Sequence, residues 1–213
     1  MNNVAEVRGV YMKFGSETVL KDVNMDLKEG MIHGIVGRNG SGKTVLMKCI
    51  LGFLRPVRGE IKVFGKRIGK DCDFAPDTGM IIETPGFIDT ESGRANLEYL
   101  RRVSAKKPGN MDTEEAMRLV GLDPKSKKAV GKYSLGMRQR LGIAQAIMER
   151  PRLLILDEPL NGLDNQGVED IRRLLMDFQK QGMTILLASH NPLDISLLCG
   201  QVYEMDGGVL RSR

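Results

Sequence analysis

The sequence predicts an α/β fold with a mostly parallel sheet, an antiparallel β part at the N-terminus and an inserted helical subdomain. Apolar segments of strand length alternate with helical segments on both sides of the insertion, as expected for parallel strands joined by helices. Residues 93–150 have a helical pattern with almost no strand signal. A chain of 213 residues therefore reads as one domain with an insertion of about 60 residues.

The N-terminal elements follow from glycine positions and apolar spacing. In residues 1–30, apolar side chains alternate weakly and are interrupted by Gly15 and Gly30, which predicts an antiparallel strand pair. Gly52, with Pro56 beyond it, predicts the end of a helix. The further elements expected here are a buried strand at 31–36, a glycine-rich loop at 37–42, a helix at 44–51, and strands at 61–64 and 80–83.

The helical part and the C-terminal part are predicted in the same way. Asp112 followed by Glu115 resembles a capping box, and Pro151 stops the last inserted helix. We expect helices at 94–104, 112–120 and 137–149, then a buried strand at 153–156, a helix at 166–181, a buried strand at 184–188 and a hairpin at 202–211. We place the helical subdomain at 88–150 and the core of a single domain at 1–87 and 151–213.

Composition and charge exclude several classes of function. The net charge of +5 comes from basic clusters that are short and scattered, with no tryptophan nearby, so we expect a solvated surface and no nucleic-acid partner. No apolar run approaches the length of a membrane span, and the N-terminus lacks a basic start followed by an apolar segment. We therefore expect neither secretion nor membrane spanning, and reduced cysteines in a cytosolic protein.

A glycine-rich motif indicates phosphate binding. It matches the pattern of glycine, four residues and Gly-Lys-Ser/Thr, and it consists of Gly37, Arg38, Asn39, Gly40, Ser41, Gly42, Lys43 and Thr44. Glycines let backbone N–H groups surround a polyphosphate, and the following helix presents its positive end. Lys43 would contact the β- and γ-phosphates, and the Thr44 hydroxyl would bind Mg²⁺. A nucleotide site in a phosphate-loop NTPase core is therefore predicted.

Two carboxylates follow the predicted strand at 153–156. Asp157 and Glu158 lie at its carboxyl end, where ligands bind in open α/β sheets. Asp157 is expected to hold Mg²⁺, directly or through water. Glu158 is expected to polarise a water for in-line attack on the γ-phosphate.

A third segment distinguishes this chain from other phosphate-loop proteins. It reads Tyr-Ser-Leu-Gly-Met-Arg-Gln-Arg at residues 133–140 and resembles the signature of ATP-binding-cassette (ABC) transporter ATPases, which kinases and GTPases lack. The resemblance runs from about residue 4 to residue 205. It implies that Ser134 and Gly136 contact the γ-phosphate of ATP bound to another subunit, so that the active form is a head-to-tail dimer, homomeric or heteromeric.

The same resemblance assigns roles to further positions. His190 matches the switch histidine that contacts the γ-phosphate, and residues 161–164 match a loop along the dimer interface. Phe14 matches the aromatic residue that stacks on adenine, although Tyr11 could take that role instead. His33 lies inside a predicted strand and matches no ligand position, so we expect it to be structural.

Three positions depart from the usual family pattern. Glu83 stands where most members have glutamine, which would change water positioning and Mg²⁺ charge balance, because a carboxylate cannot donate a hydrogen bond. Leu135 replaces the first glycine of the signature. With Glu83, it resembles the ATPases of bacitracin- and lantibiotic-type peptide exporters. Val45 replaces a hydroxyl that would contact the α-phosphate, at an expected cost of about 1 kcal/mol in nucleotide affinity.

The resemblance implies an ATP hydrolase that drives a separate membrane subunit from the cytoplasmic face of the membrane, and that supports export of, or resistance to, antimicrobial peptides or drugs. A cytoplasmic helix of that subunit would dock on the insertion near Glu83 and Phe87. The side chains of Phe87, Ile88, Leu97 and Leu100 would line this groove or form the core of the helical subdomain. Two alternatives remain: a soluble ABC ATPase acting on nucleic acid or ribosomes, and a non-hydrolysing regulator.

Overall fold

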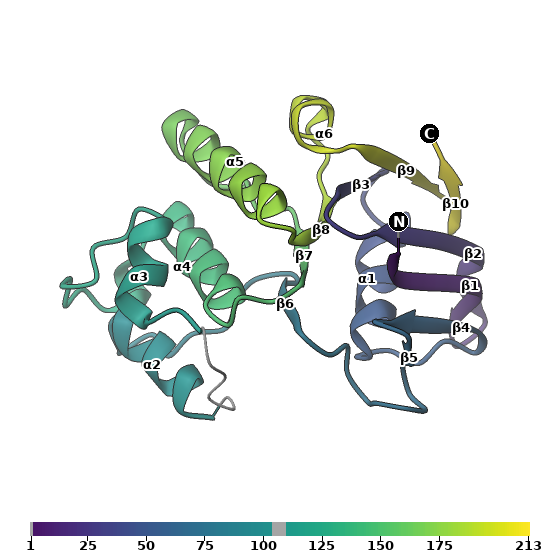
Figure 1. Ribbon diagram of the computed structural model, residues 1–213, viewed down its shortest axis with the longest axis horizontal. Helices are drawn as coiled ribbons and strands as arrows, with labels where there is room; N and C mark the ends of the chain where they lie inside the picture. The colour runs from purple at the N-terminus through teal and green to yellow at the C-terminus, as the bar shows by residue number, and fades with distance from the viewer. Residues whose placement is uncertain (1, 104–109) are drawn as a thin grey trace.

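An antiparallel sheet begins the chain, as the sequence predicts. The computed structural model describes residues 2–103 and 110–213. The long strands β1 (Asn3–Phe14) and β2 (Glu17–Lys28) pair antiparallel. β4 (Arg58–Val63) and β5 (Lys66–Arg67) extend this sheet in the order β2-β1-β4-β5. This sheet lies at the right in Figure 1 and covers α1.

The second sheet is mostly parallel. Its order is β10-β9-β3-β8-β7-β6, and only the terminal hairpin between β9 and β10 is antiparallel among the described pairs. The strands are β3 (Ile32–Val36), β6 (Thr78–Ile81), β7 (Leu153–Asp157), β8 (Thr184–Ala188), β9 (Gln201–Asp206) and β10 (Val209–Ser212). β8 is buried along its whole length, because helices or strands cover both faces of such a sheet.

The helices divide into two groups. α2 (Gly93–Val103), α3 (Thr113–Leu119) and α4 (Leu135–Ile147), with the 3₁₀ turn η1 (Val130–Lys132), gather away from the antiparallel sheet (Figure 1). α1 (Lys43–Leu51), α5 (Asn165–Lys180) and α6 (Pro192–Leu198) accompany the parallel sheet. No described helix combines the length and apolar character needed to cross a bilayer.

The structure corrects some element boundaries. The strand predicted at 80–83 occupies Thr78–Ile81, and α4 begins at Leu135 because Ser134 caps it. Ser104, the expected end of α2, lies outside the described residues. Three described elements, β5, η1 and α6, were not predicted from the sequence. For α6 a signal was present, because Asn191 caps the helix and proline occupies its first position.

Two clusters of buried apolar residues pack against opposite faces of β7. Leu154 and Leu156 belong to the cluster with the helical insertion, whereas Leu153 and Ile155 belong to the cluster with α1 and the antiparallel sheet. Successive side chains of a strand point to opposite faces, so β7 is fixed from both sides. Of the four residues proposed for a docking groove, Leu97 is fully buried in the helical cluster, which favours its core role.

Candidate active site

The phosphate loop joins β3 to α1 and leaves the first turn of that helix uncapped by any side chain. Gly37 has φ 153°, and a Cβ added there would lie 2.2 Å from the carbonyl oxygen of Met205. Gly42, the N-cap residue, has φ 113°, in the region that L side chains rarely adopt. Glycine is therefore required at both positions, and the N–H groups of the first turn remain open to an anion.

Lys43 is buried against the same loop. Its Nζ donates hydrogen bonds to the carbonyl oxygens of Gly37, at 2.7 Å, and Arg38, at 3.0 Å. The Ser41 hydroxyl is also buried and has no hydrogen-bond partner among the described residues. A buried ammonium must keep hydrogen-bond acceptors, so phosphate oxygens can replace the loop carbonyls around Lys43.

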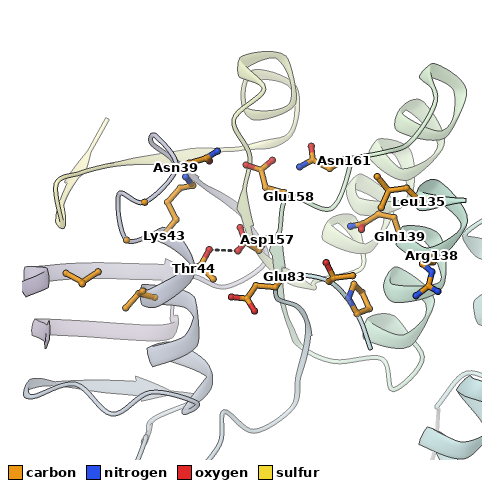
Figure 2. Close-up of a pocket in the computed structure, with 16 residues that line it drawn as sticks. Asn39, Lys43, Thr44, Glu83, Leu135, Arg138, Gln139, Asp157, Glu158 and Asn161 are labelled. Carbon is orange, nitrogen blue, oxygen red and sulfur yellow. Dashed lines mark hydrogen bonds between the residues drawn. The ribbon is translucent and has the colours of Figure 1, made fainter. Parts of the chain in front are cut away.

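Thr44 and Asp157 meet across the site although 113 residues separate them. The Thr44 hydroxyl donates to Asp157 Oδ2 at 2.5 Å, shown by the dashed line in Figure 2. Thr44 lies in the first turn of α1, and Asp157 is the last residue of β7. A hydroxyl and a carboxylate are oxygen donors of the kind that Mg²⁺ prefers, so these two side chains fit the ion predicted from the sequence.

Glu158 and His190 form a second pair. His190 Nδ1 lies 2.8 Å from Glu158 Oε2. The pair is possible because Glu158 follows β7 and His190 follows β8, and these strands are parallel neighbours, with Asp157 opposite Ala188. Glu158 has φ 50°, an uncommon backbone conformation for glutamate that occurs often at functional sites.

These groups surround a cavity of about 500 Å³ between the phosphate loop and α4 (Figure 2). Nine residues predicted for the site line it: Asn39, Gly40, Gly42, Lys43, Thr44, Val45, Glu83, Asp157 and Glu158. Predicted residues outside this lining are Phe14, Gly37, Arg38, Ser41, Ser134, Gly136 and His190. The lining residues that the sequence analysis gave no role are Val19, Thr84, Pro85, Arg138 and Gln139. Arg138 and Gln139 belong to the signature segment at 133–140 but were assigned no role, and no motif marks Val19, Thr84 or Pro85.

The aromatic candidates for adenine stacking differ in accessibility. Phe14, at the end of β1, is 48% exposed. The guanidinium of Arg58 lies over the Tyr11 ring, 5.7 Å from its centroid. One face of Tyr11 is therefore occupied, whereas Phe14 is free to accept a base, and its role in stacking stays a prediction.

The signature segment lies at the exposed N-terminus of α4. Ser134 accepts a hydrogen bond from the Met137 N–H at 3.2 Å, and Leu135 is 63% exposed. A Cβ on Gly136 would lie 2.8 Å from the carbonyl oxygen of Gly162, so this glycine lets the 161–164 loop pack closely. Within one chain, Ser134 and Gly136 do not line the cavity beside the phosphate loop.

Glu83 has a partner that the sequence analysis missed. Its Oε1 lies 2.7 Å from Lys48 Nζ, and its backbone has φ 59°. Lys48 follows Thr44 by four residues in α1, so the two side chains share a helix face. That spacing indicates a shared helix face but does not identify Glu83 as the partner.

Comparison with known proteins agrees with this geometry. The ABC transporter family pattern matches residues 20–161. The uncharacterised ABC transporter ATP-binding protein YybJ of Bacillus subtilis is 37% identical over 97% of this chain and 94% of its own length. The bacitracin transport ATP-binding protein BcrA of Enterococcus faecalis is 39% identical over 99% of this chain and 68% of its own length.

A solved structure shows the same fold. The ATP-binding subunit of an ABC transporter superposes with a TM-score of 0.88 at 24% identity, covering 99% of this chain and 89% of the other. The fold class and the family predicted from the sequence are thereby confirmed. The chain belongs to the ABC transporter family, as an ATP-binding subunit that hydrolyses ATP.

Proposed function

We propose that this chain hydrolyses MgATP at sites shared with a second ATPase subunit and drives a separate membrane subunit that exports antimicrobial peptides of the bacitracin or lantibiotic type. The observation that carries the hydrolytic part is the pairing of Thr44 with Asp157 and of His190 with Glu158 at the ends of neighbouring strands. The likeness to BcrA, together with Glu83 and Leu135, supports the peptide substrate.

Thr44 and Asp157 would hold Mg²⁺, which supplies charge neutralisation at the β- and γ-phosphate oxygens when it is bound. Lys43 would exchange its bonds to the loop carbonyls for bonds to these phosphates. The open N–H groups of the α1 first turn stabilise negative charge in the same place. These groups bind and orient the γ-phosphate for attack.

Glu158 would accept a proton from the attacking water, since its carboxylate lies at the end of β7 and lines the cavity. His190 holds that carboxylate through Nδ1 at 2.8 Å. Phe14 would stack on the adenine. Asn39, Ser41 and Val45 would lie beside the bound phosphates.

A second subunit would complete each site. Ser134 and Gly136 stand at an exposed helix N-terminus, outside the cavity of their own chain. Facing a phosphate loop of another subunit, this N-terminus would stabilise the γ-phosphate. The helical subdomain, at residues 88–150, carries this segment, and the ATP-binding core occupies 1–87 and 151–213. Homodimer and heterodimer both satisfy this arrangement.

The membrane partner would hold this chain at the cytoplasmic face of the membrane. Ile88, which is 50% exposed, and the partly buried Phe87 follow Glu83 closely and would contact a cytoplasmic helix of that partner. Movement of such a helix would then change the position of Glu83. No nucleic-acid partner is needed for this cycle.

The variant Glu158→Gln tests the hydrolytic mechanism. A glutamine keeps the size of the side chain and removes the base, so hydrolysis should fall about 100-fold or more. The variant should also form a dimer that depends on ATP, measured by size-exclusion chromatography. Unchanged turnover would remove Glu158 from the role of base.

Copurification from the native cell tests the transport part. Detergent extracts should yield a membrane subunit together with the chain, and cells carrying Glu158→Gln should become more sensitive to bacitracin or a lantibiotic. Recovery of ribosomes or DNA in place of a membrane protein would favour the soluble ATPase alternative.

A further inference from the structure

We propose that Lys48 is a positioning residue for ATP hydrolysis. Its ammonium group holds the Glu83 carboxylate, which lines the nucleotide cavity, and neutralises the charge of that carboxylate. This inference rests on the proposed function, because it concerns the same site. It goes beyond it in assigning a role to a residue outside the phosphate-loop motif. The contact itself is the 2.7 Å ion pair between Lys48 Nζ and Glu83 Oε1.

Helix α1 binds two neighbouring strand ends through two successive turns. Thr44 contacts Asp157 at 2.5 Å, and Lys48, one turn later, contacts Glu83 at 2.7 Å. Asp157 ends β7, and Glu83 follows the end of β6. These strands are parallel neighbours, with Ile81 opposite Leu156. One rigid helix therefore sets the positions of two carboxylates in the cavity relative to each other.

The charges in the cavity explain why a cation is needed there. Three carboxylates line it, those of Glu83, Asp157 and Glu158. Of the two cationic residues in the lining, Lys43 contacts loop carbonyls and Arg138 contacts Asp89. Without Lys48, the Glu83 charge would oppose the entry of a polyphosphate, since like charges repel.

The exposure of the pair argues against a role in holding the fold together. The Glu83 side chain is 64% exposed and that of Lys48 is 28% exposed. Ion pairs this open to water contribute little to folding stability. The Glu83 backbone lies in the left-handed region, which favours a site where conformation serves function. The pair is therefore expected to affect turnover more than unfolding.

A double-mutant cycle tests the assignment. The four proteins are the wild type, Lys48→Met, Glu83→Gln and the double variant, each purified as the full chain and assayed for kcat/KM with MgATP. Lys48→Met should lower kcat/KM about tenfold when residue 83 is glutamate, and less than about twofold when it is glutamine, because a neutral amide needs no counter-ion. Lys48→Arg, which keeps the charge, should stay within about threefold of the wild type.

The control is Lys180→Met, which breaks an exposed ion pair with Asp177 on α5 and should leave kcat/KM unchanged. Equal losses from Lys48→Met in both backgrounds would overturn the proposal. If Lys48→Met unfolds while the double variant folds, the ion pair stabilises the fold and the positioning role fails. If both unfold, Lys48 is a structural residue and the proposal fails.

The two proposals fail in different ways. A wild-type chain that binds ATP without hydrolysing it would overturn the proposed function. A wild type that depends on Glu158 for turnover, yet shows no coupling between residues 48 and 83, would overturn the role of Lys48 alone.

Discussion

Two helix N-termini, those of α1 and α4, carry glycine-containing motifs, but the chain's own side chains cap only one of them. At α1 the N-cap residue is Gly42 and no side chain caps the helix. At α4 the Ser134 side chain already accepts a hydrogen bond from Met137 N–H. Both termini border the same cavity, which the α4 end reaches through Leu135, Arg138 and Gln139, but Ser134 itself is exposed and does not line it.

The glycines of the two motifs also have different neighbours. At Gly37 a side chain would collide with the carbonyl oxygen of Met205, in the strand that packs beside the phosphate loop. At Gly136 it would meet the carbonyl oxygen of Gly162, which belongs to the loop predicted to lie at a subunit interface. The residues predicted to bind phosphate are thus brought together within one chain at α1, whereas Ser134 and Gly136 of the signature segment are predicted to act on another subunit. The following predictions test this contrast.

Lys43→Ala should have the largest effect. It removes the cation of the phosphate-binding end, so ATP binding and hydrolysis should both fall about 100-fold or more. Binding of a fluorescent ATP analogue and phosphate release measure the two losses. The exposed lysine at position 66 of β5 provides a control, because Lys66→Ala should change neither. ATP affinity within about threefold of the wild type would contradict the role of Lys43.

Ser134→Ala should separate binding from turnover. The isolated chain should bind ATP with unchanged affinity, while ATP-dependent dimer formation and hydrolysis fall about tenfold. Loss of the cap should also lower the free energy of unfolding by about 1 kcal/mol. Chemical denaturation, nucleotide binding, size-exclusion chromatography with ATP and phosphate release measure these four quantities.

Asp112→Ala is the matched control for Ser134→Ala. Asp112 caps α3 by accepting a hydrogen bond from Glu115 N–H at 2.7 Å, so its loss should cost a similar free energy without slowing hydrolysis. Equal turnover in the two variants would show that the signature end acts only as a helix cap.

His33→Gln should have the smallest effect, and it concerns the strand that leads into the phosphate loop. His33 is fully buried in β3, and its Nε2 lies 3.0 Å from the Lys28 carbonyl oxygen. Burial lowers the pKa of His33 below its ordinary 6.5, so below pH 6.5 the unfolded chain binds a proton that the folded chain does not. Stability from neutral His33 is complete above this pH and is lost as the pH falls.

Denaturation curves between pH 5 and pH 8 check this prediction (about 1.4 kcal/mol per pH unit is the limiting slope for one proton). Wild-type stability should fall below pH 6.5 more steeply than that of His33→Gln. ATP hydrolysis at pH 8 should be the same in both proteins. Parallel stability curves would show that His33 has the same pKa in the folded and the unfolded chain, and would contradict this prediction.

Much of the site was predictable because its chemistry lies in contiguous motifs. The phosphate loop follows one strand, and Asp157 and Glu158 lie at the carboxyl end of another; apolar residues mark both strands for burial, and ligands bind at the carboxyl ends of such strands. The spacing of these residues therefore predicted their location in the fold, and their roles in hydrolysis stay predictions. The fold class followed from the same alternation of strands and helices.

Contacts between distant segments were not predictable in this way. Lys48 and Glu83 lie 35 residues apart, and neither belongs to a motif that names the other. Their contact depends on β6 lying next to β7, which is a matter of sheet order. Likewise, Val19 and Gln139 line the cavity only because the antiparallel sheet and the helical insertion flank the parallel sheet.

Local composition and spacing thus determined the fold class, the phosphate-binding end of the site, the two acidic residues after β7 and the family, since each depends on residues close together in the chain. Tertiary structure alone decided which side chains pair across strands. It joined Thr44 to Asp157 and His190 to Glu158, gave Glu83 its counter-ion, and left Ser134 outside its own cavity. The physical reason is that these contacts depend on strand order and layer packing, which no single segment of sequence specifies.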